Sequence, residues 1–279
     1  MLCNLIARHS VPIDARLGVP GLPQSATGQA TMFTGVNASQ YMGRHCEGFP
    51  GPSLRRLIED GNIMMDLTRK GIRCRFADAY MVDHVDELRT RRFKSVTTVM
   101  ALTEPRVIST QDDLRENFAV THDITRESIR DKGHDVKIIT PQEAAQHLLS
   151  VARAYDFTLF EYFQTDLSGH SRNYDQAVST LRTLDAFLGA VVELCQISSI
   201  LLVLTSDHGN IEDMGTRGHT LNQVPLIAVG PGAEQIQAGA TSLTDIQPRL
   251  TRFMVPGAVF IPRTVSPINQ PEGGVAVGL

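Results

Sequence analysis

The sequence predicts an α/β protein with a doubly wound, mostly parallel sheet. Two short apolar runs, 157–163 (FTLFEYF) and 200–205 (ILLVLT), are rich in β-forming residues, as buried parallel strands are. Residues 173–194 between them carry apolar side chains at helical spacing, which predicts a long crossover helix. A strand, a helix and a second strand in that order make a βαβ unit, from which this fold class is built.

Further elements extend this unit on both sides. Residues 225–229 (PLIAV) predict another strand. Residues 142–154 predict a helix, with Thr140 and Pro141 as its start signal. A shorter helix is expected at 53–59.

These elements suggest a division of the chain into a core, an insertion and a tail. We assign residues 1–43 and 136–261 to the α/β core, and the more polar stretch 44–135 to a small insertion that caps the edge of the sheet. Residues 262–279 are rich in Pro and Gly, so we expect a flexible tail there.

The overall charge argues against several classes of partner. The formal net charge is -4 and the isoelectric point lies near 6.1, so the chain has no electrostatic footprint for nucleic acid or an anionic membrane. No apolar run is long enough to span a bilayer. Any phosphate binding must therefore depend on local groups.

The cysteines and the first residues bear on the compartment. The cysteines are widely scattered without a C-x-x-C pair, which favours buried reduced thiols over a zinc ribbon or disulfides: Cys3, Cys46, Cys74 and Cys195. Residues 1–16 lack the pattern of a secretory signal. We therefore expect a cytoplasmic protein.

Metal-ligating residue types follow the two predicted strands of the βαβ unit. Asp166 and His170 (DLSGH) come after the first strand, and Asp207 and His208 (DHGN) come after the second. The carboxyl ends of parallel strands meet at one edge of the sheet, so these side chains should lie close together. Asp and His suit zinc or manganese, and His219 (RGHT) adds a further candidate ligand.

Each motif alone also has an ordinary structural explanation. A single D-H-G is often a turn in which Asp caps and Gly supplies a positive φ. Both motifs at strand ends, with His219 downstream, are much less expected by chance.

A candidate nucleophile lies near the start of the chain. Ser25 follows Pro23-Gln24 and opens a short helical stretch, which places its hydroxyl beside free backbone N–H groups. Such a position binds phosphate and suits a nucleophile, although Ser25 by itself could simply be a helix cap.

The order of these motifs resembles a known signature. Ser-x-x-Gly, Asp-x-x-Gly-His, Thr-Ser-Asp-His-Gly-Asn and Gly-His-Thr occur in the order seen in the alkaline phosphatase superfamily, in the branch of the cofactor-independent phosphoglycerate mutases. The likeness runs from about Leu22 to Met254 and is strongest to the metal-binding domain of those mutases. It implies an alkaline phosphatase-like fold.

The resemblance also implies a site with two divalent ions, Mn or Zn. It assigns Asp166, His170 and His219 to one metal, and Asp207, His208 and the Ser25 oxygen to the other. Ser25 would be the nucleophile of a phosphoryl transfer from a small phosphorylated substrate. Such a chain would be a metal-dependent phosphatase or phosphomutase-like enzyme with neither nucleic acid nor membrane as partner.

The chain departs from the family pattern in ways that leave alternatives open. The family's first strand ends in Asp-Gly, and no such strand precedes Ser25, so we expect an upstream strand to be missing. Asp14 is the one acidic residue before Ser25 and lies too close to it to take that Asp's place. The mutases read Ser-Glu-Val-Gly-His where this chain has Ser25-Ala26-Thr27-Gly28-Gln29, so Thr27 stays open as a substitute nucleophile, since other members of the superfamily use threonine.

These departures affect the expected activity. The mutases carry a large second domain, and the insertion at 44–135 is too short for it, so a phosphatase fits better than a mutase. The alternative is an impaired or non-catalytic metal-binding remnant that lacks the first Asp ligand.

Overall fold

The computed structural model describes residues 1–257, 263 and 265–268, and it has strands and helices in alternation. The strands are β1 (Ser10–Ile13), β2 (Cys74–Tyr80), β3 (Ile108–Thr110), β4 (Phe157–Leu159), β5 (Leu202–Leu204) and β6 (Val224–Val229). The α/β class is therefore confirmed.

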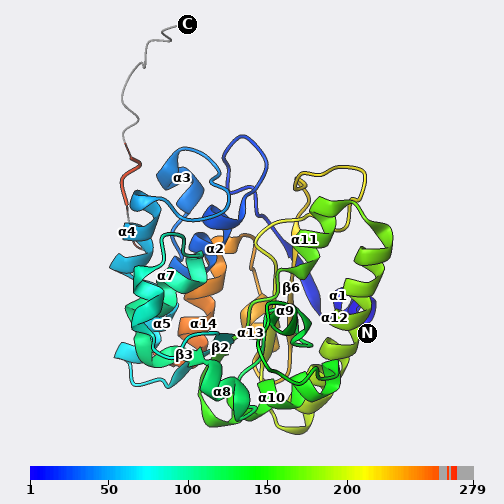
Figure 1. The fold of residues 1–279 in the computed structure, drawn as a ribbon. Helices are drawn as coiled ribbons and strands as arrows, with labels where there is room; N and C mark the ends of the chain where they lie inside the picture. The colour runs from blue at the N-terminus through cyan, green and yellow to red at the C-terminus, as the bar shows by residue number, and fades with distance from the viewer. Residues whose placement is uncertain (258–262, 264, 269–279) are drawn as a thin grey trace, which may run out of the picture.

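Helices surround the strands (Figure 1). They are α1 (Leu2–His9), α2 (Ser25–Thr34), α3 (Ala38–Met42), α4 (Pro52–Asp60), α5 (Ile63–Arg69), α6 (Asp86–Thr90), α7 (Val96–Thr103), α8 (Gln111–Arg115), α9 (Glu127–Asp131), α10 (Pro141–Ala154), α11 (Gln164–Ser171), α12 (Tyr174–Ile197), α13 (Ala233–Gln237) and α14 (Ile246–Met254). Short 3-10 turns lie at Pro105–Val107 and Leu243–Asp245.

The strands form two three-stranded groups, which we call the half-sheets. In the first, ordered β3-β2-β4, both neighbours run parallel to β2. In the second, ordered β1-β6-β5, β6 runs antiparallel to both neighbours. The predicted strand at 225–229 is thus present as β6, with a direction that the sequence did not reveal.

Apolar side chains cover both faces of the second half-sheet. Ile227 and Val229 pack with α10 and α12, whereas Leu226 and Ala228 pack on the opposite face with residues of α13 and α14. This alternation is the period of two expected for a strand buried on both faces. In Figure 1, α12 flanks the half-sheets on one side and α4, α5 and α7 lie on the other.

The helices begin where their sequence signals predict. The side chains of Thr140 and Glu143 form a reciprocal capping box at the start of α10, and Pro141 occupies its first turn. The crossover helix is present as α12, and the Asn173 side chain accepts the N–H of Gln176 at its start. Within the described part of the chain, no helix combines the length and apolar character that crossing a membrane requires.

Residues 44–135 differ from the expected cap. They supply β2 and β3, which build the parallel half-sheet with β4, so this stretch contributes strands to the core. These strands were not predicted from the sequence, because β3 has only three residues and β2 carries the charged Arg75 and Asp78 among apolar residues. Most of the predicted tail, 262–279, lies outside the described residues.

Candidate metal centre and nucleophile

Two of the predicted ligands lie on one face of α11. Asp166 and His170 are four residues apart, so their side chains point the same way from consecutive turns. Asp166 had been expected directly after a strand, but β4 ends at Leu159 and Asp166 lies in the first turn of the helix. His219 reaches the same point from a loop in which Thr220 bridges to Gly209.

These three side chains converge as a set that could hold a metal ion. The Nε2 atoms of His170 and His219 are 3.2 Å apart, and they lie 3.3 and 3.4 Å from Asp166 Oδ1. A carboxylate with two imidazoles is a donor set suited to a divalent transition metal.

Backbone carbonyls orient both imidazole rings. Nδ1 of His170 lies 2.6 Å from the carbonyl oxygen of Arg217, and Nδ1 of His219 lies 2.6 Å from that of Pro23. A carbonyl only accepts, so each Nδ1 carries a proton, and each ring turns its Nε2 toward the other ring and toward Asp166. An Nε2 that carries no second proton can bind a cation through its lone pair, so these residues fit a metal ion.

The electrostatics of the cluster agree with this interpretation. Burial alone would lower the pKa of His219, but the Asp166 carboxylate and the Pro23 carbonyl raise it above its ordinary value. Burial alone would raise the pKa of Asp166, but the hydrogen bond to His219 and the positive charge of the neighbouring histidines lower it. The cluster therefore attracts positive charge.

Asp207, His208 and Ser25 form a second group beside the first. His208 Nε2 lies 2.9 Å from Ser25 Oγ, 3.6 Å from Asp207 Oδ2 and 3.9 Å from Asp166 Oδ1. Its ring stacks on that of His219, with 3.6 Å between centroids. Burial raises the pKa of Asp207. The predicted ligands of both metals thus lie in one continuous cluster.

The hydroxyl of Ser25 lies at the amino end of a helix. Ser25 is the first residue of α2, after the extended Gln24, so the N–H groups of Ser25 and Ala26 lie at the start of the helix, whereas that of Thr27 donates to the carbonyl of Cys46. Gly28 allows α2 to approach the second group closely, because a Cβ there would lie only 2.7 Å from the backbone oxygen of Asp207. The Ser-x-x-Gly spacing therefore has a packing reason.

Thr27 and Asp14, the other two residues considered from the sequence, make hydrogen bonds to nearby backbone groups. Thr27 is fully buried, and its hydroxyl hydrogen-bonds to the carbonyl of Gln24 and accepts the N–H of Cys46. The Asp14 carboxylate accepts the N–H groups of Arg16 and Leu17 in its own turn. The Thr27 hydroxyl and the Asp14 carboxylate are thus both held by neighbouring backbone groups.

Glu161 is a polar residue of the site that the sequence reasoning did not select. Its carboxylate accepts hydrogen bonds from Gln29 and from Thr97, and burial and the nearby Asp207 raise its pKa. Its backbone N–H donates to the carboxylate of the buried Asp78, 2.8 Å away. A charged residue inside the apolar run 157–163 was the signal that could have revealed it.

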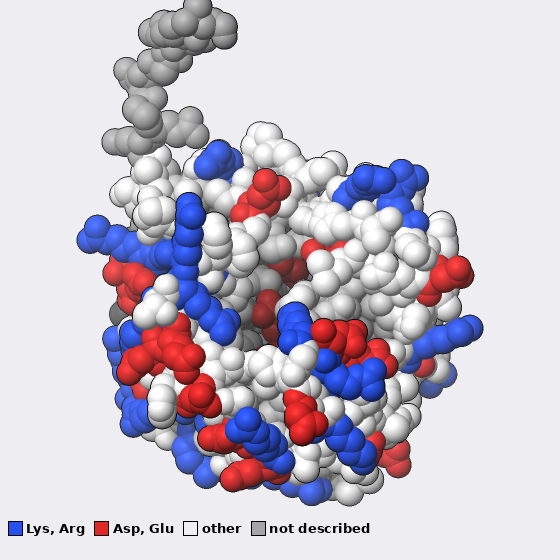
Figure 2. Space-filling view, viewed as in Figure 1, with Lys and Arg blue, Asp and Glu red and all other residues white. Residues whose placement is uncertain are grey.

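The cluster opens into a hollow of the molecule. A cavity of about 1140 Å³ is lined by Ser25, Glu161, Asp166, Asp207 and His208 among others. Figure 2 shows the molecule hollowed at the centre of this face, with acidic side chains deep inside. A small substrate could therefore reach the cluster.

A comparison with protein families identifies the class of protein. The family model described as the metalloenzyme superfamily matches residues 114–255, about half of the chain, which include every predicted ligand except Ser25. The chain belongs to the metalloenzyme superfamily, and divalent metal ions are the cofactors that its ligand set fits.

Curated relatives are 2,3-bisphosphoglycerate-independent phosphoglycerate mutases. The protein of Gloeobacter violaceus is 30% identical over 162 residues, which cover 50% of this chain and 30% of the relative. That of Chromohalobacter salexigens is 36% identical over 110 residues, 37% of this chain and 21% of the relative. The chain thus spans less than a third of the length of these relatives.

Solved structures show the fold. The alkaline phosphatase of the Antarctic bacterium TAB5 superposes with a TM-score of 0.56 at 13% identity, covering 88% of both chains. The cold-active alkaline phosphatase of Shewanella sp. gives 0.55 at 12% identity, covering 88% of this chain and 90% of the other. An alkaline phosphatase-like α/β fold is therefore established for this chain.

Proposed function

We propose that this chain is a metal-dependent phosphoryl-transfer enzyme that acts on a small phosphorylated molecule. The observation that carries the proposal is the position of Ser25 Oγ, at the amino end of α2 and 2.9 Å from His208 in the ligand cluster. Membership of the metalloenzyme superfamily and the likeness to phosphoglycerate mutases support it.

The two groups of side chains would hold two divalent ions. Asp166, His170 and His219 would bind one, and Asp207, His208 and the Ser25 oxygen would bind the other. Bound divalent ions in such a pair lower the pKa of a coordinated hydroxyl and shield the charge of the attacking and leaving oxygens. Titration of the protein with each metal decides whether these groups bind Mn or Zn.

The protein's own groups would position the substrate and the nucleophile. The N–H groups of Ser25 and Ala26 at the start of α2 would bind phosphate oxygens. Ser25 Oγ would form a bond to phosphorus as the bond to the leaving oxygen breaks, which gives a phosphoserine that water later hydrolyses. His208 is buried and stacked on His219, so it would hold its orientation during this exchange.

Hydrolysis is the form of phosphoryl transfer that we favour. Residues 44–135 contribute β2 and β3 to the core of the fold. The cavity beside the cluster is open to one face of the molecule, which allows water to compete with an acceptor alcohol.

Phosphoserine trapping tests the proposal. We expect the protein, supplied with Mn or Zn and an aryl phosphate and then quenched in acid, to carry one phosphate on the peptide that contains Ser25. The Ser25→Ala variant should carry none, and Thr27→Val should be labelled like the parent. A label on Thr27, or full turnover by Ser25→Ala, would contradict the assignment.

A metal-binding protein without catalysis is the second candidate. The observation that favours it is the use of the Asp14 carboxylate by its own turn, which leaves the second group with Asp207 and the more distant Asp166 as its carboxylates. Metal titration separates the two candidates: one tightly bound ion without phosphoserine supports the second, and two ions with phosphoserine support the first.

A further inference from the structure

Two arginines are buried among the described residues, and only one of them has an acidic partner. Arg75 and Arg126 are 7% and 5% exposed. Arg75 forms an ion pair with Asp113 and a hydrogen bond with Ser109. No carboxylate of the described residues forms an ion pair with Arg126, whose guanidinium bonds to neutral groups instead. A guanidinium stays charged in proteins, and a buried charge without a counter-charge is costly.

The hydrogen bonds of Arg126 leave part of its guanidinium unused. Nη2 lies 3.0 Å from the side-chain oxygen of Asn117, and 3.4 and 3.3 Å from the carbonyl of Leu114 and Nδ1 of His147. Nε is enclosed and makes no hydrogen bond. Burial lowers the pKa of Arg126, which the charge of Glu143 offsets only in part. The positive charge is thus poorly compensated by the described residues.

The nearby carboxylates do not pair with this guanidinium. The carboxylate of Asp123 accepts backbone N–H groups of its own loop, including that of Arg126. Glu143 caps the start of α10 and lies 3.6 Å from Nζ of Lys137. Asp135 is exposed, and it forms no ion pair with Arg126. An anion from outside the chain is therefore the partner that this site lacks.

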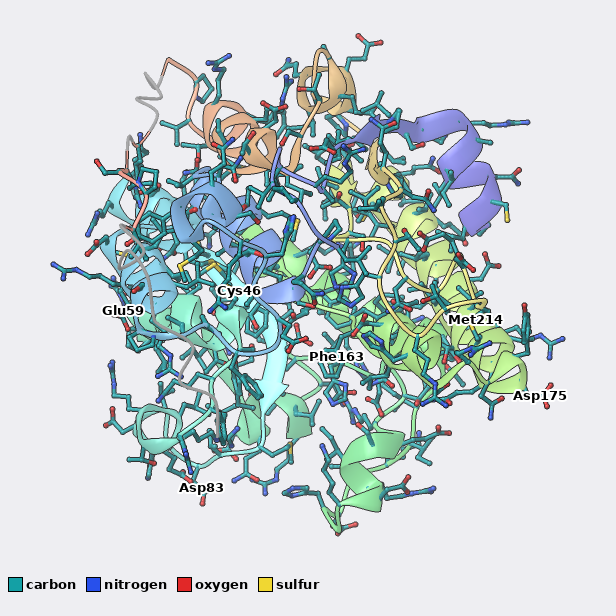
Figure 3. The ribbon with its side chains drawn as sticks, turned by 90° about the horizontal axis from the view of Figure 1, so that it is seen from above. Cys46, Glu59, Asp83, Phe163, Asp175 and Met214 are labelled. Carbon is teal, nitrogen blue, oxygen red and sulfur yellow. The ribbon has the colours of Figure 1, made fainter. Side chains whose placement is uncertain are left out.

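Arg126 lines a second cavity of the molecule. This cavity has a volume of about 320 Å³ and is also lined by His147 and by apolar side chains such as Leu114 and Ile139. It shares no lining residue with the larger cavity at the metal cluster. In Figure 3, α9, which begins directly after Arg126, is the green helix at the lower edge of the view, below the labelled Phe163 of the larger cavity. The two cavities are thus separate.

His147 adds a hydrogen-bond donor to the wall of this second cavity. Its Nδ1 lies 3.3 Å from Nη2 of Arg126, and a guanidinium only donates, so Nδ1 accepts. Burial and the charge of Arg126 lower the pKa of His147, which favours the neutral ring. The proton of a neutral ring with Nδ1 as acceptor lies on Nε2. The wall therefore carries an N–H donor next to the guanidinium.

We propose that the second cavity binds a small monocarboxylate, with its carboxylate on the guanidinium of Arg126 and its apolar part against Leu114, Val136 and Ile139. The proposal does not depend on phosphoryl transfer at the metal cluster. The planar guanidinium matches the two oxygens of a carboxylate, and the volume lies at the small end of ligand pockets, which span about 300–1,000 Å³. One poorly compensated cation matches one negative charge, and the acidic side chains that also line the cavity disfavour a phosphate dianion.

Titration of the full chain, supplied with Zn, with three small probes tests the proposal. Butyrate carries the carboxylate and an apolar chain, butanol has the same shape without the charge, and propyl phosphate has a different anionic group. Nitrogen–proton NMR follows the Nε–H of Arg126 and the backbone amides of 143–147, so the signal reports on this cavity and not on the metal cluster. We expect butyrate to shift these signals saturably, butanol at the same concentrations to leave them unchanged, and propyl phosphate to bind several-fold more weakly.

Variants of the arginine give an independent readout. Arg126→Met should weaken butyrate binding, followed at 143–147, by at least about tenfold, because the charged hydrogen bonds are lost. Arg130→Met, at an exposed position of α9 that does not line the cavity, is the matched control and should bind like the parent. If Arg126→Met does not fold, Arg126→Lys keeps the charge without the planar fork and should bind several-fold more weakly than the parent. Butyrate should also raise the melting temperature of the parent and of Arg130→Met, but not that of Arg126→Met.

Several outcomes would overturn the proposal. Equal shifts with butanol and butyrate would mean that the cavity recognises only apolar shape. Undiminished butyrate binding by Arg126→Met would mean that Arg126 has a purely structural role. Tighter binding of propyl phosphate than of butyrate would replace the carboxylate by a phosphate as the ligand group. The absence of any saturable shift with butyrate would mean that the cavity holds only water.

Discussion

The facing nitrogens of His170 and His219 are the strongest argument for a metal at the level of single residues. Each ring is fixed by a carbonyl at Nδ1, so neither Nε2 can carry a proton without breaking a 2.6 Å contact or charging the ring. Such pre-orientation of ligands by their second hydrogen bond is common in metal sites and contributes about 10–100-fold to affinity.

Removal of one imidazole should therefore release the metal. We expect His219→Ala to lose the ion held with Asp166 and His170, measured by elemental analysis after gel filtration. His9→Ala, at an exposed position of α1, is the matched control and should keep the parent's metal content. Equal metal in His219→Ala and the parent would show that the assignment of this group is wrong.

Asp78 should make the stability of the folded protein depend on pH. Its carboxyl group is buried on β2, and burial raises its pKa well above the usual range despite the hydrogen bond from the N–H of Glu161. The folded state thus binds more protons than the unfolded state between the ordinary pKa near 3.8 and the raised folded value. In that window stability falls as the pH rises.

The variant Asp78→Asn should remove this dependence. Its free energy of unfolding, relative to that of the parent, should increase from about pH 4 to neutral pH, because the parent alone must bury a charge there. Urea unfolding at a series of pH values measures the difference. Parallel curves for the two proteins would show that Asp78 titrates normally in the fold.

At the level of elements, the approach of α2 to the loop at Asp207 depends on one glycine. In an ordinary helix, Gly→Ala stabilises by up to about 1 kcal/mol. At Gly28 the added Cβ would meet the backbone oxygen of Asp207 at 2.7 Å, and a backbone atom cannot move aside as a flexible side chain can. At Gly28, substitution by alanine should therefore destabilise the protein instead of stabilising it.

We expect Gly28→Ala to destabilise the protein by about 1–3 kcal/mol. It should also reduce phosphoserine formation, since α2 carries Ser25. Gly189→Ala in α12 is the control, because its Cβ would meet nothing closer than 3.9 Å, and it should stabilise by about 0.5–1 kcal/mol. If thermal unfolding shows both variants more stable than the parent, α2 has room to move.

The elements also show how far sequence reasoning reaches. The helices α10 and α12 were predictable because caps and apolar periodicity are local signals. The length of β4 was not predictable, because residues 160–163 have the composition of a strand but pair with no strand among the described residues. The strands β2 and β3 were missed because their pairing is set by distant segments.

The same limit applies to the candidate site. Motifs at element ends predicted which Asp and His residues converge, and the structure brings them together. Glu161 has no motif around it, and its contacts with Gln29 and Thr97 come from separate helices, so only the fold reveals them. The roles of all these residues remain predictions.

At the scale of the whole molecule, the predicted ligands come from both half-sheets. Asp166 follows β4 of the parallel half-sheet, whereas Asp207 and His208 follow β5 of the other. An ion that binds the folded state and not the unfolded state stabilises the fold, by about 2.7 kcal/mol at a hundred times its Kd. For a chain of this size, each kcal/mol raises the melting temperature by roughly 2–4 °C.

Removal of the metal should therefore lower the melting temperature. We expect the protein freed of metal by a chelator to melt about 5–10 °C below the protein supplied with Mn or Zn. His219→Ala should gain less from added metal than the parent, because it lacks one predicted ligand, whereas His9→Ala should gain as much as the parent. If added metal leaves the melting temperature of the parent unchanged, these residues do not hold an ion in the folded state.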